Sequence, residues 1–323
     1  MPYGQDAVVG IAMQNSFGTA ANVGSLHHIP LLNEDVGLVQ QELLSQNLTG
    51  RFDEGDSYSG TRRFDGTIEC EAQPKALGAL LTATINDPTT TTSGSVGTFV
   101  FKPRTSDWDA FSPNRPVTYF KDLKEAGSAQ LFYDLCGTRF EVQQSAEGFL
   151  IARASFVAGK TSTSSASLTA DTGRRWPWNQ ASLSLNGSGV ADFRDITITH
   201  DEGIQPRWYL DGNLTAGRSK REANRTVRVS GTIVFETQSH LNDLKNETTQ
   251  PFILTWKGST AIQSGFFDTF QIIIPAFRWI DFKPAIRGAG PLEVQFTGRG
   301  QYHSGSGTTI QYTLQNTWSA GYV

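Results

Sequence analysis

Apolar and polar residues alternate along several segments of the chain. In the segment 292–297, leucine, valine and phenylalanine occupy one set of alternate positions, and glutamate, glutamine and threonine occupy the other. The segment 310–318 repeats this pattern, with Ile310, Tyr312 and Leu314 on its apolar side. Successive side chains of a strand point to opposite faces, so each segment has one packed face and one wet face. This pattern is typical of antiparallel sheet.

The alternation, with turn residues between the segments, predicts strands along most of the chain and only two short helices. The first helix begins at Pro74, where proline suits the first helical turn, and continues through Leu77, Leu80 and Leu81. The second covers His240 to Leu244. The predicted strands are 26–33, 43–48, 63–72, 97–102, 116–121, 131–135, 139–144, 150–157, 193–199, 207–214, 226–237, 251–257, 269–274, 292–298 and 310–318.

The same β unit occurs twice, about 165 residues apart. The run Asn47–Gly50 and the strand Phe64–Glu71 return as Asn213–Ala216 and Val229–Glu236, with apolar residues at matching alternate positions. A slip of one residue would exchange the two faces, so matching parity indicates shared structure. We therefore predict two tandem, related antiparallel β-sandwich or barrel modules, each with a short flanking helix. The predicted divisions are an N-terminal arm at 1–24, without fixed structure in the isolated chain, a first module at 25–160 with an insertion at about 86–113, a linker at 161–175 and a second module at 176–323.

Composition narrows the possible functions. The chain has 323 residues, a formal net charge of −4 and two cysteines. It therefore has no global basic field to attract nucleic acid and no disulfide framework. The first ten residues lack the pattern of a secretory signal, and no apolar run reaches the 18 or so residues of a membrane span. We expect a protein made in the cytosol with no membrane partner.

Candidate catalytic and metal sites are weak. His27 and His28 are adjacent on a predicted strand, so their side chains point to opposite faces and cannot share a metal ion. The acidic run at 53–56 lacks the spacing of a calcium loop. We predict no catalytic residues, no metal and no cofactor. The tryptophans at 176, 178, 208 and 279 could stack on sugars if exposed, so a carbohydrate-binding or sugar-cleaving β-sandwich is the alternative.

The polar faces of the predicted strands carry carboxylates, amides and hydroxyls, with arginine only at strand starts. Such a surface binds phosphate poorly, which suits a wall along which DNA must slide. The candidate residues for this wall are Thr67, Glu69, Glu71, Thr232, Glu236, Glu293, Gln295 and Thr297. The two predicted hairpins end in tips of opposite charge, with Asp53, Glu54 and Asp56 in the first and Arg218, Lys220, Arg221 and Arg225 in the second. We predict that these tips make contacts between subunits.

The order of elements resembles that of the major tail tube proteins of long, non-contractile-tailed (siphovirus-like) bacteriophages. The resemblance is carried by a Gly/Ala-rich start at 17–20, a strand at Ile29–Leu32, a long hairpin, the Gly-centred strand at Phe64–Ile68 and the short helix at Leu77–Leu81. It implies a structural virion protein that polymerises into stacked rings, the conduit for genome ejection into the host. The virion tail would be its location, after assembly in the host cytoplasm.

The resemblance also implies partners. The family commonly forms six-membered rings of one module per subunit, so two modules per chain imply trimeric rings with pseudo-sixfold symmetry, with hexameric rings as the alternative. Tape-measure, tail-terminator and distal tail proteins would be further partners, and DNA would pass transiently and without specificity. The insertion near 86–113 would be an outward decoration or a contact between rings.

Overall fold

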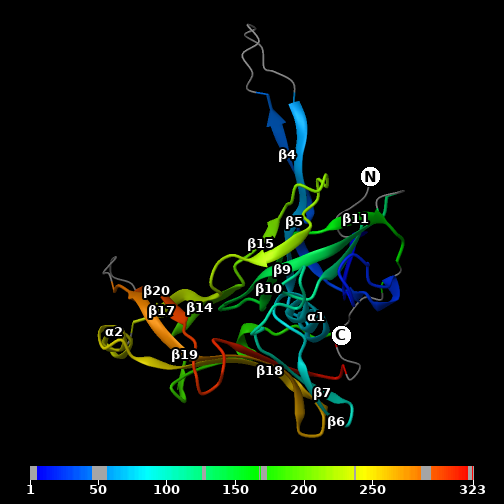
Figure 1. The fold of residues 1–323 in the computed structure, drawn as a ribbon. Helices are drawn as coiled ribbons and strands as arrows, with labels where there is room; N and C mark the ends of the chain where they lie inside the picture. The colour runs from blue at the N-terminus through cyan, green and yellow to red at the C-terminus, as the bar shows by residue number, and fades with distance from the viewer. Residues whose placement is uncertain are drawn as a thin grey trace.

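The computed structural model describes residues 6–45, 57–125, 129–166, 168, 173–235, 238–284, 292–318 and 322. These residues form mainly antiparallel strands, with two α-helices, α1 (Pro74–Thr84) and α2 (Ser239–Lys245) (Figure 1). The predicted all-β class and both predicted helices are confirmed. The strands are β1 Val8–Met13, β2 His27–His28, β3 Leu31–Glu34, β4 Gly37–Leu44, β5 Ser57–Glu71, β6 Thr89–Ser93, β7 Val96–Phe101, β8 Val117–Asp122, β9 Gln130–Ser145, β10 Ile151–Ala158, β11 Lys160–Thr163, β12 Ala181–Leu185, β13 Ser188–Val190, β14 Phe193–Asp201, β15 Ile204–Arg207, β16 Arg218–Arg221, β17 Thr226–Val234, β18 Thr249–Gln263, β19 Phe266–Phe282, β20 Glu293–Gly300 and β21 Gln311–Asn316.

One long sheet runs through both halves of the chain. Its order is β3 and β4, which lie end to end along one edge of β5, then β5, β10, β9, β14, β17, β20 and β19. The order β3–β5–β10–β9 of the first half therefore returns as β14–β17–β20–β19 in the second. The joint between the halves is the antiparallel pairing of β9 with β14, from Arg139 opposite Asp201 to Ser145 opposite Asp195.

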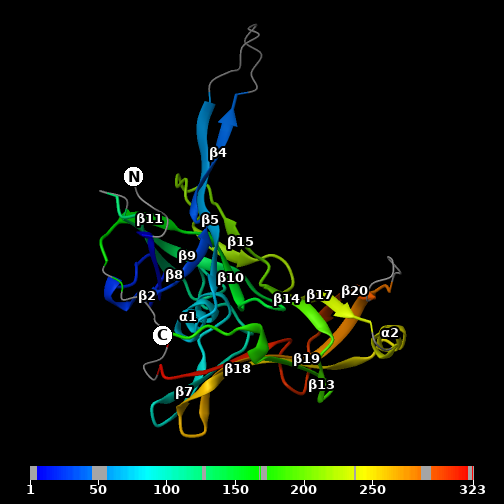
Figure 2. The same ribbon diagram turned by 180° about the vertical axis from the view of Figure 1, so that it is seen from behind.

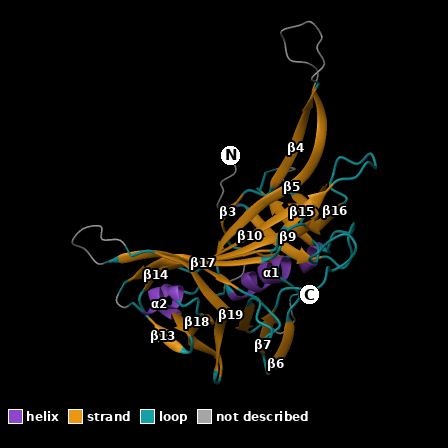
Figure 3. Cartoon of the chain, turned by 60° about the vertical axis from the view of Figure 1, so that its left-hand side comes forward, coloured by secondary structure: helices purple, strands orange, loops and turns teal. Residues whose placement is uncertain are grey.

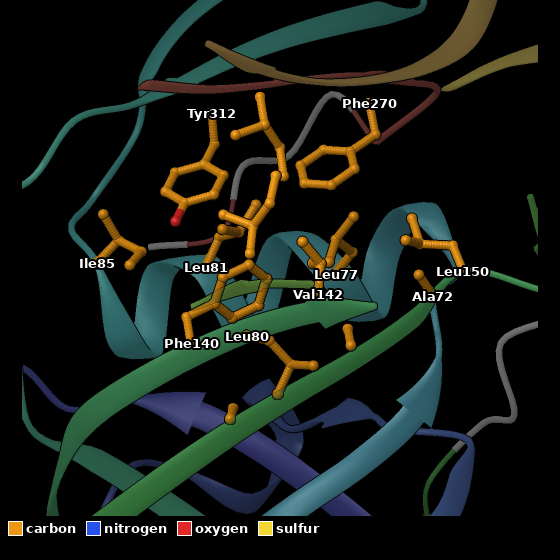
Figure 4. Close-up of a cluster of buried hydrophobic side chains, with 14 of the residues drawn as sticks. Ala72, Leu77, Leu80, Leu81, Ile85, Phe140, Val142, Leu150, Phe270 and Tyr312 are labelled. Carbon is orange, nitrogen blue, oxygen red and sulfur yellow. The ribbon is translucent and has the colours of Figure 1, made fainter. Parts of the chain in front are cut away.

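Each half adds a second layer through its longest strand. The first part of β9 pairs with β8 and β11. β18 pairs with most of β19, from Phe266 to Arg278, and β21 pairs with its first part. Helix α1 lies between the long sheet and the layer that contains β19 and β21 (Figure 4). Its Leu77, Leu80 and Leu81 are completely buried, together with Phe140 of β9 and Tyr312 of β21. These side chains form the centre of the hydrophobic core, whose burial stabilises the fold.

The N-terminal arm and the insertion differ from the sequence-based predictions. Residues 8–13, predicted to lack fixed structure in the isolated chain, form the buried strand β1, which pairs with β8 along its whole length. The Thr-rich part of the insertion, for which no strand was predicted, forms β6 and pairs with β7 as a hairpin. Strand β7 pairs with β21, so the insertion extends a sheet of the second half.

Two predicted strand patterns were also wrong in detail. The segments 131–135 and 139–144 belong to one strand, β9, because Gly137 sits directly against the end of α1 and the backbone continues past it with a bulge. The segment 207–214 is not an arm of a long second hairpin. Within the part of the chain that the structure describes, β15 pairs only with the short β16, and β17 pairs with β14 and β20.

Two glycines allow close approach of the chain at corresponding places in the two halves. A Cβ on Gly66 would lie 2.5 Å from the Cα atom of Val36, and one on Gly231 would lie 2.2 Å from the carbonyl oxygen of Asp195. We predict that Gly66→Ala and Gly231→Ala each lower the free energy of unfolding by about 1–3 kcal/mol through overpacking. Gly189→Ala is the matched control, since no atom lies within 4 Å of its added Cβ. Urea denaturation of the three variants checks this, and equal midpoints would contradict it.

Candidate functional site

One face of the long sheet is mainly polar from β5 to β20. The opposite face carries the core residues, such as Ile68, Val142 and Ile198, which are at most 2% exposed. We call the first surface the polar face. It contains Asp65, Thr67, Glu69 and Glu71 of β5, Arg153 and Ser155 of β10, Arg139, Glu141 and Gln143 of β9, Asp195, Thr197, Thr199 and Asp201 of β14, Arg228, Ser230 and Thr232 of β17, and Glu293, Gln295, Thr297 and Arg299 of β20. Seven of the eight predicted wall residues are therefore on one surface; Glu236 lies outside the described residues.

Charges of opposite sign alternate across the first half of the polar face. Arg153 lies between Glu69 and Glu141, at 3.1 and 2.8 Å from their carboxylate oxygens. Glu141 also accepts hydrogen bonds from Arg139 at 2.5 Å and from Thr199 at 3.0 Å. Partial burial raises the pKa of Glu141, but the bonds from Arg153, Thr199 and Arg139 outweigh this effect and lower the pKa below its ordinary value. This part of the face therefore stays ionised and internally neutralised.

The predicted wall glutamates are ion-paired. Glu69 pairs with Arg153, Glu71 pairs with Arg175, and Glu293 pairs with Arg194. The prediction of a wall nearly free of cations is therefore wrong. The sequence shows that Arg139 shares a strand face with Glu141, and that Arg153 shares one with Ser155. It does not show that β10 pairs with β5 and β9 pairs with β14, which brings these arginines onto the same surface as the predicted wall residues.

The second half of the polar face carries a row of arginines. Arg228 of β17 lies opposite Arg299 of β20, which lies opposite Arg278 of β19. Arg278 reaches Glu247 at 2.9 Å, while Arg228 and Arg299 are exposed. The three guanidinium groups lie on adjacent strands, so they concentrate positive charge in one place on the polar face. Like charges directly opposite one another destabilise a sheet, so this arrangement lowers the stability of the fold. We call these three residues the arginine row.

The basic residues predicted at the second hairpin tip are bound within the chain. Arg221 and Arg225 both bind the carboxylate of Glu202, at 2.6 and 2.9 Å. Lys220 is 3.5 Å from Asp107, and the guanidinium of Arg218 lies between the rings of Phe111 and Tyr209. The acidic residues Asp53, Glu54 and Asp56 lie outside the described residues, so the contact between the tips stays a prediction.

Glu202 is a fully buried charge at the junction of the halves. Its carboxylate also lies 3.0 Å from Nε2 of His200, whose Nδ1 lies 3.1 Å from the hydroxyl of Tyr312. Burial raises the pKa of Glu202, but His200 and Arg225 outweigh burial and lower the pKa to about 2. Arg225 also donates a hydrogen bond to the carbonyl of Arg104, so the network ties the insertion to the second half.

The described residues hold little that suggests other chemistry. They contain no group of three or more histidine, cysteine, aspartate or glutamate side chains placed to bind a metal ion. Within the same residues, no helix has the length and apolar character needed to cross a membrane. The tryptophans at 176 and 279 are buried in the core, and Trp208 donates to the carbonyl of Arg62, which leaves Trp178 as the half-exposed member of the set.

Comparison with known proteins identifies one relationship. A family model described as phage tail tube protein matches residues 4–300, which is most of the chain. No curated protein sequence matches.

Proposed function

The chain belongs to the phage tail tube protein family, whose members are structural proteins of the virion tail, and we propose that it forms the DNA conduit of a siphovirus-like tail from a duplicated module. The observation that carries the proposal is the long sheet, with a polar face on one side and the core on the other. A sheet of this kind can close into a barrel that encloses a polar channel. Stacked barrels would then form a continuous tube.

Strand order supports a duplicated module. The first half pairs β3–β5–β10–β9 and the second half pairs β14–β17–β20–β19. Along the chain, α1 lies between β5 and β9, and α2 lies between β17 and β19. Gly66 approaches Val36 in the first half as Gly231 approaches Asp195 in the second. The same added Cβ on Gly66 would lie 2.7 Å from the carbonyl carbon of Asp35, so Asp35 corresponds in place to Asp195.

The joint between the halves suggests how chains join. β14 pairs with β17 on one edge and with β9 on the other. In the first half, β3 and β4 together occupy the corresponding place, and among the described residues they pair only with β5. An open strand edge favours pairing with another chain. We propose that β4 of one chain pairs as a strand with the second half of the next chain, in the way that β14 pairs with β9 within one chain.

Three chains suffice for a channel of useful size. Each chain contributes eight neighbouring strand positions to the long sheet, so a trimer would provide about 24 strands. At about 4.8 Å between strands, the barrel would be at least roughly 37 Å across between backbones before strand tilt widens it. Closed rings are the usual result of repeated heterologous contacts.

We predict that the purified protein forms tubes whose rings contain three chains. Native mass spectrometry of rings released from tubes should give a trimer of the 35.3 kDa chain, and a reconstruction without imposed symmetry should show six similar modules. Six chains per ring would replace the trimer with the hexameric alternative. Discrete particles without rings or tubes, at any concentration, would contradict the proposed function itself.

The polar face would form the channel wall. Thr67, Thr232 and Thr297 keep it wetted, and the paired glutamates at 69, 71 and 293 would limit attraction to phosphate. Tape-measure protein would occupy this channel before DNA does, and tail-terminator and distal tail proteins would contact its two ends. The arginine row would be the part of the wall that attracts DNA most strongly.

A further inference from the structure

A second polar surface lies on the other side of the core from the polar face. It belongs to the layer in which β7, β21, β19 and β18 pair in that order. The core side of this layer carries Phe99, Phe270 and Leu314, which are 0% exposed. Residues directly opposite one another share a face, so two rows of residues cross the other side of the layer. We call their polar members the neutral face: Thr98, Gln315 and Thr269 in one row, and Thr313, Gln271 and Thr255 in the other.

The neutral face is depleted of charge, in contrast to the polar face. β6 and β12 extend its two rows with Thr91 and Ser182. Among the described residues of both rows, Lys257 is the only charged one, and its ammonium lies 4.2 Å from the centre of the Phe267 ring. A well-solvated surface is usually about 25–35% charged. Removing water from hydroxyls and amides costs far less than removing it from ions, so this face suits a partner that is itself neutral.

Hydrogen bonds hold the side chains of the neutral face in place before any partner binds. The amide nitrogen of Gln315 donates to the hydroxyl of Thr98 at 3.1 Å, and that of Gln271 donates to the hydroxyl of Thr255 at 3.0 Å. In each pair the threonine hydroxyl can still donate its hydrogen, and the glutamine oxygen can still accept one. Each pair therefore presents a donor beside an acceptor, and little side-chain entropy is lost when a partner uses both.

This arrangement matches the chemistry of sugars. A sugar hydroxyl donates and accepts hydrogen bonds, whereas carboxylates only accept and guanidinium groups only donate. Adjacent strands are about 4.8 Å apart, close to the length of one sugar unit, so a sugar chain that crosses the strands would meet one side chain of a row with each unit. In the next row Ile253 lies opposite Ile273, which gives the C–H groups of a sugar ring an apolar surface.

We propose that the neutral face binds a neutral polysaccharide. The inference rests on the proposed function for its placement: the polar face turns toward the channel, so the neutral face turns outward. Figures 2 and 3 show β7 and β18 on one side of α1 and β9 and β10 on the other. Three copies in each ring, repeated along the tail, would strengthen weak binding by a single face through multivalency. A sugar polymer on a cell surface would then hold the side of the tail.

Electrophoresis in native gels that contain a polysaccharide measures this binding. The full chain is run in gels that contain dextran, galactomannan or the polyanion alginate, and at least one of the two neutral polymers should retard the wild type while alginate does not. Thr255→Val with Gln271→Met, and Thr98→Val with Gln315→Met, remove the hydrogen-bonding groups and nearly keep side-chain size. Each double variant should bind the retarding polymer about tenfold more weakly or worse.

Thr197→Val with Gln143→Met is the matched control, because the same two residue types lie opposite each other on the polar face. Its retardation should equal that of the wild type, and urea midpoints near the wild-type value show that all three variants are folded. A wild type that neither neutral polymer retards, or an equal loss in the control variant, would overturn the inference. Micrographs of the same samples report on the tube separately: tubes without retardation contradict the polysaccharide site alone, and retardation without tubes contradicts the proposed function alone.

Discussion

Replacing Glu202 with glutamine is expected to lower the free energy of unfolding at neutral pH by about 3 kcal/mol or more. Glu202 is completely buried, and the change leaves Arg221 and Arg225 without their counter-charge. Removing one partner of a buried ion pair typically costs about 3–5 kcal/mol, because the remaining charge stays buried and unpaired. Urea denaturation at pH 7 measures the difference. Glu222→Gln is the control, because this exposed carboxylate pairs with Arg207 at the surface, where ion pairs contribute about 0–1 kcal/mol.

The same variant should show a specific pH dependence. The pKa of Glu202 is about 2 in the folded chain and near 4.5 in the unfolded chain, so its ionised form is favoured by folding. The stabilisation is complete above about pH 4.5 and is lost as the pH falls toward 2. The difference in unfolding free energy between wild type and Glu202→Gln should therefore shrink across this window, while that for Glu222→Gln changes little. A difference that stays constant from pH 7 to pH 2.5 would contradict the assignment of Glu202 as the buried hub.

The alternation of side chains was sufficient to predict most strands of the long sheet. β20 and β21 follow the predicted segments closely, since each has one buried and one wet face. Helix α1 was predictable from Pro74 and from the Leu-rich segment that follows it. Strand β6 of the insertion was not predictable, because its four successive threonines have no alternation, and their strand form depends on pairing with β7.

The charges of the site were less predictable than the strands. Glu202 follows Asp201 and precedes Gly203, a sequence that suggests an exposed turn. It is buried because Arg221, Arg225 and His200 converge on it from other segments, and this convergence depends on the tertiary fold. The ion pairs of Glu69 and Glu293 likewise join residues 84 and 99 positions apart in sequence. Alternation predicts which face a residue occupies, but not which partners share that face.

Adding lysines to the polar face should slow DNA passage, and removing arginines from it should speed DNA passage. Glu69→Lys with Glu293→Lys adds two cations per chain and also frees Arg153 and Arg194 from their carboxylate partners. A trimeric ring would then present about six new lysines, a number that changes DNA affinity by roughly 10³-fold or more between 50 and 200 mM salt. Because every ring repeats the contact, ejection from virions should slow by at least about tenfold at low salt and recover at higher salt. Arg228→Gln with Arg299→Gln should instead speed ejection and weaken its salt dependence, because it removes the exposed part of the arginine row.

The opposite changes in ejection rate that are expected of these two variants distinguish a channel wall from an outer surface. Any loss of assembly would slow or abolish ejection in both, and micrographs of intact tubes exclude that cause before rates are compared. Glu222→Lys adds a cation away from the polar face and serves as the control, with unchanged ejection expected. If the lysine and glutamine variants both eject DNA at the wild-type rate at every salt concentration, the polar face does not meet the DNA. The long sheet would then turn its core side toward the channel, with further layers between, and the ion pairs of Glu69, Glu141 and Arg153 would serve only to stabilise an exterior surface.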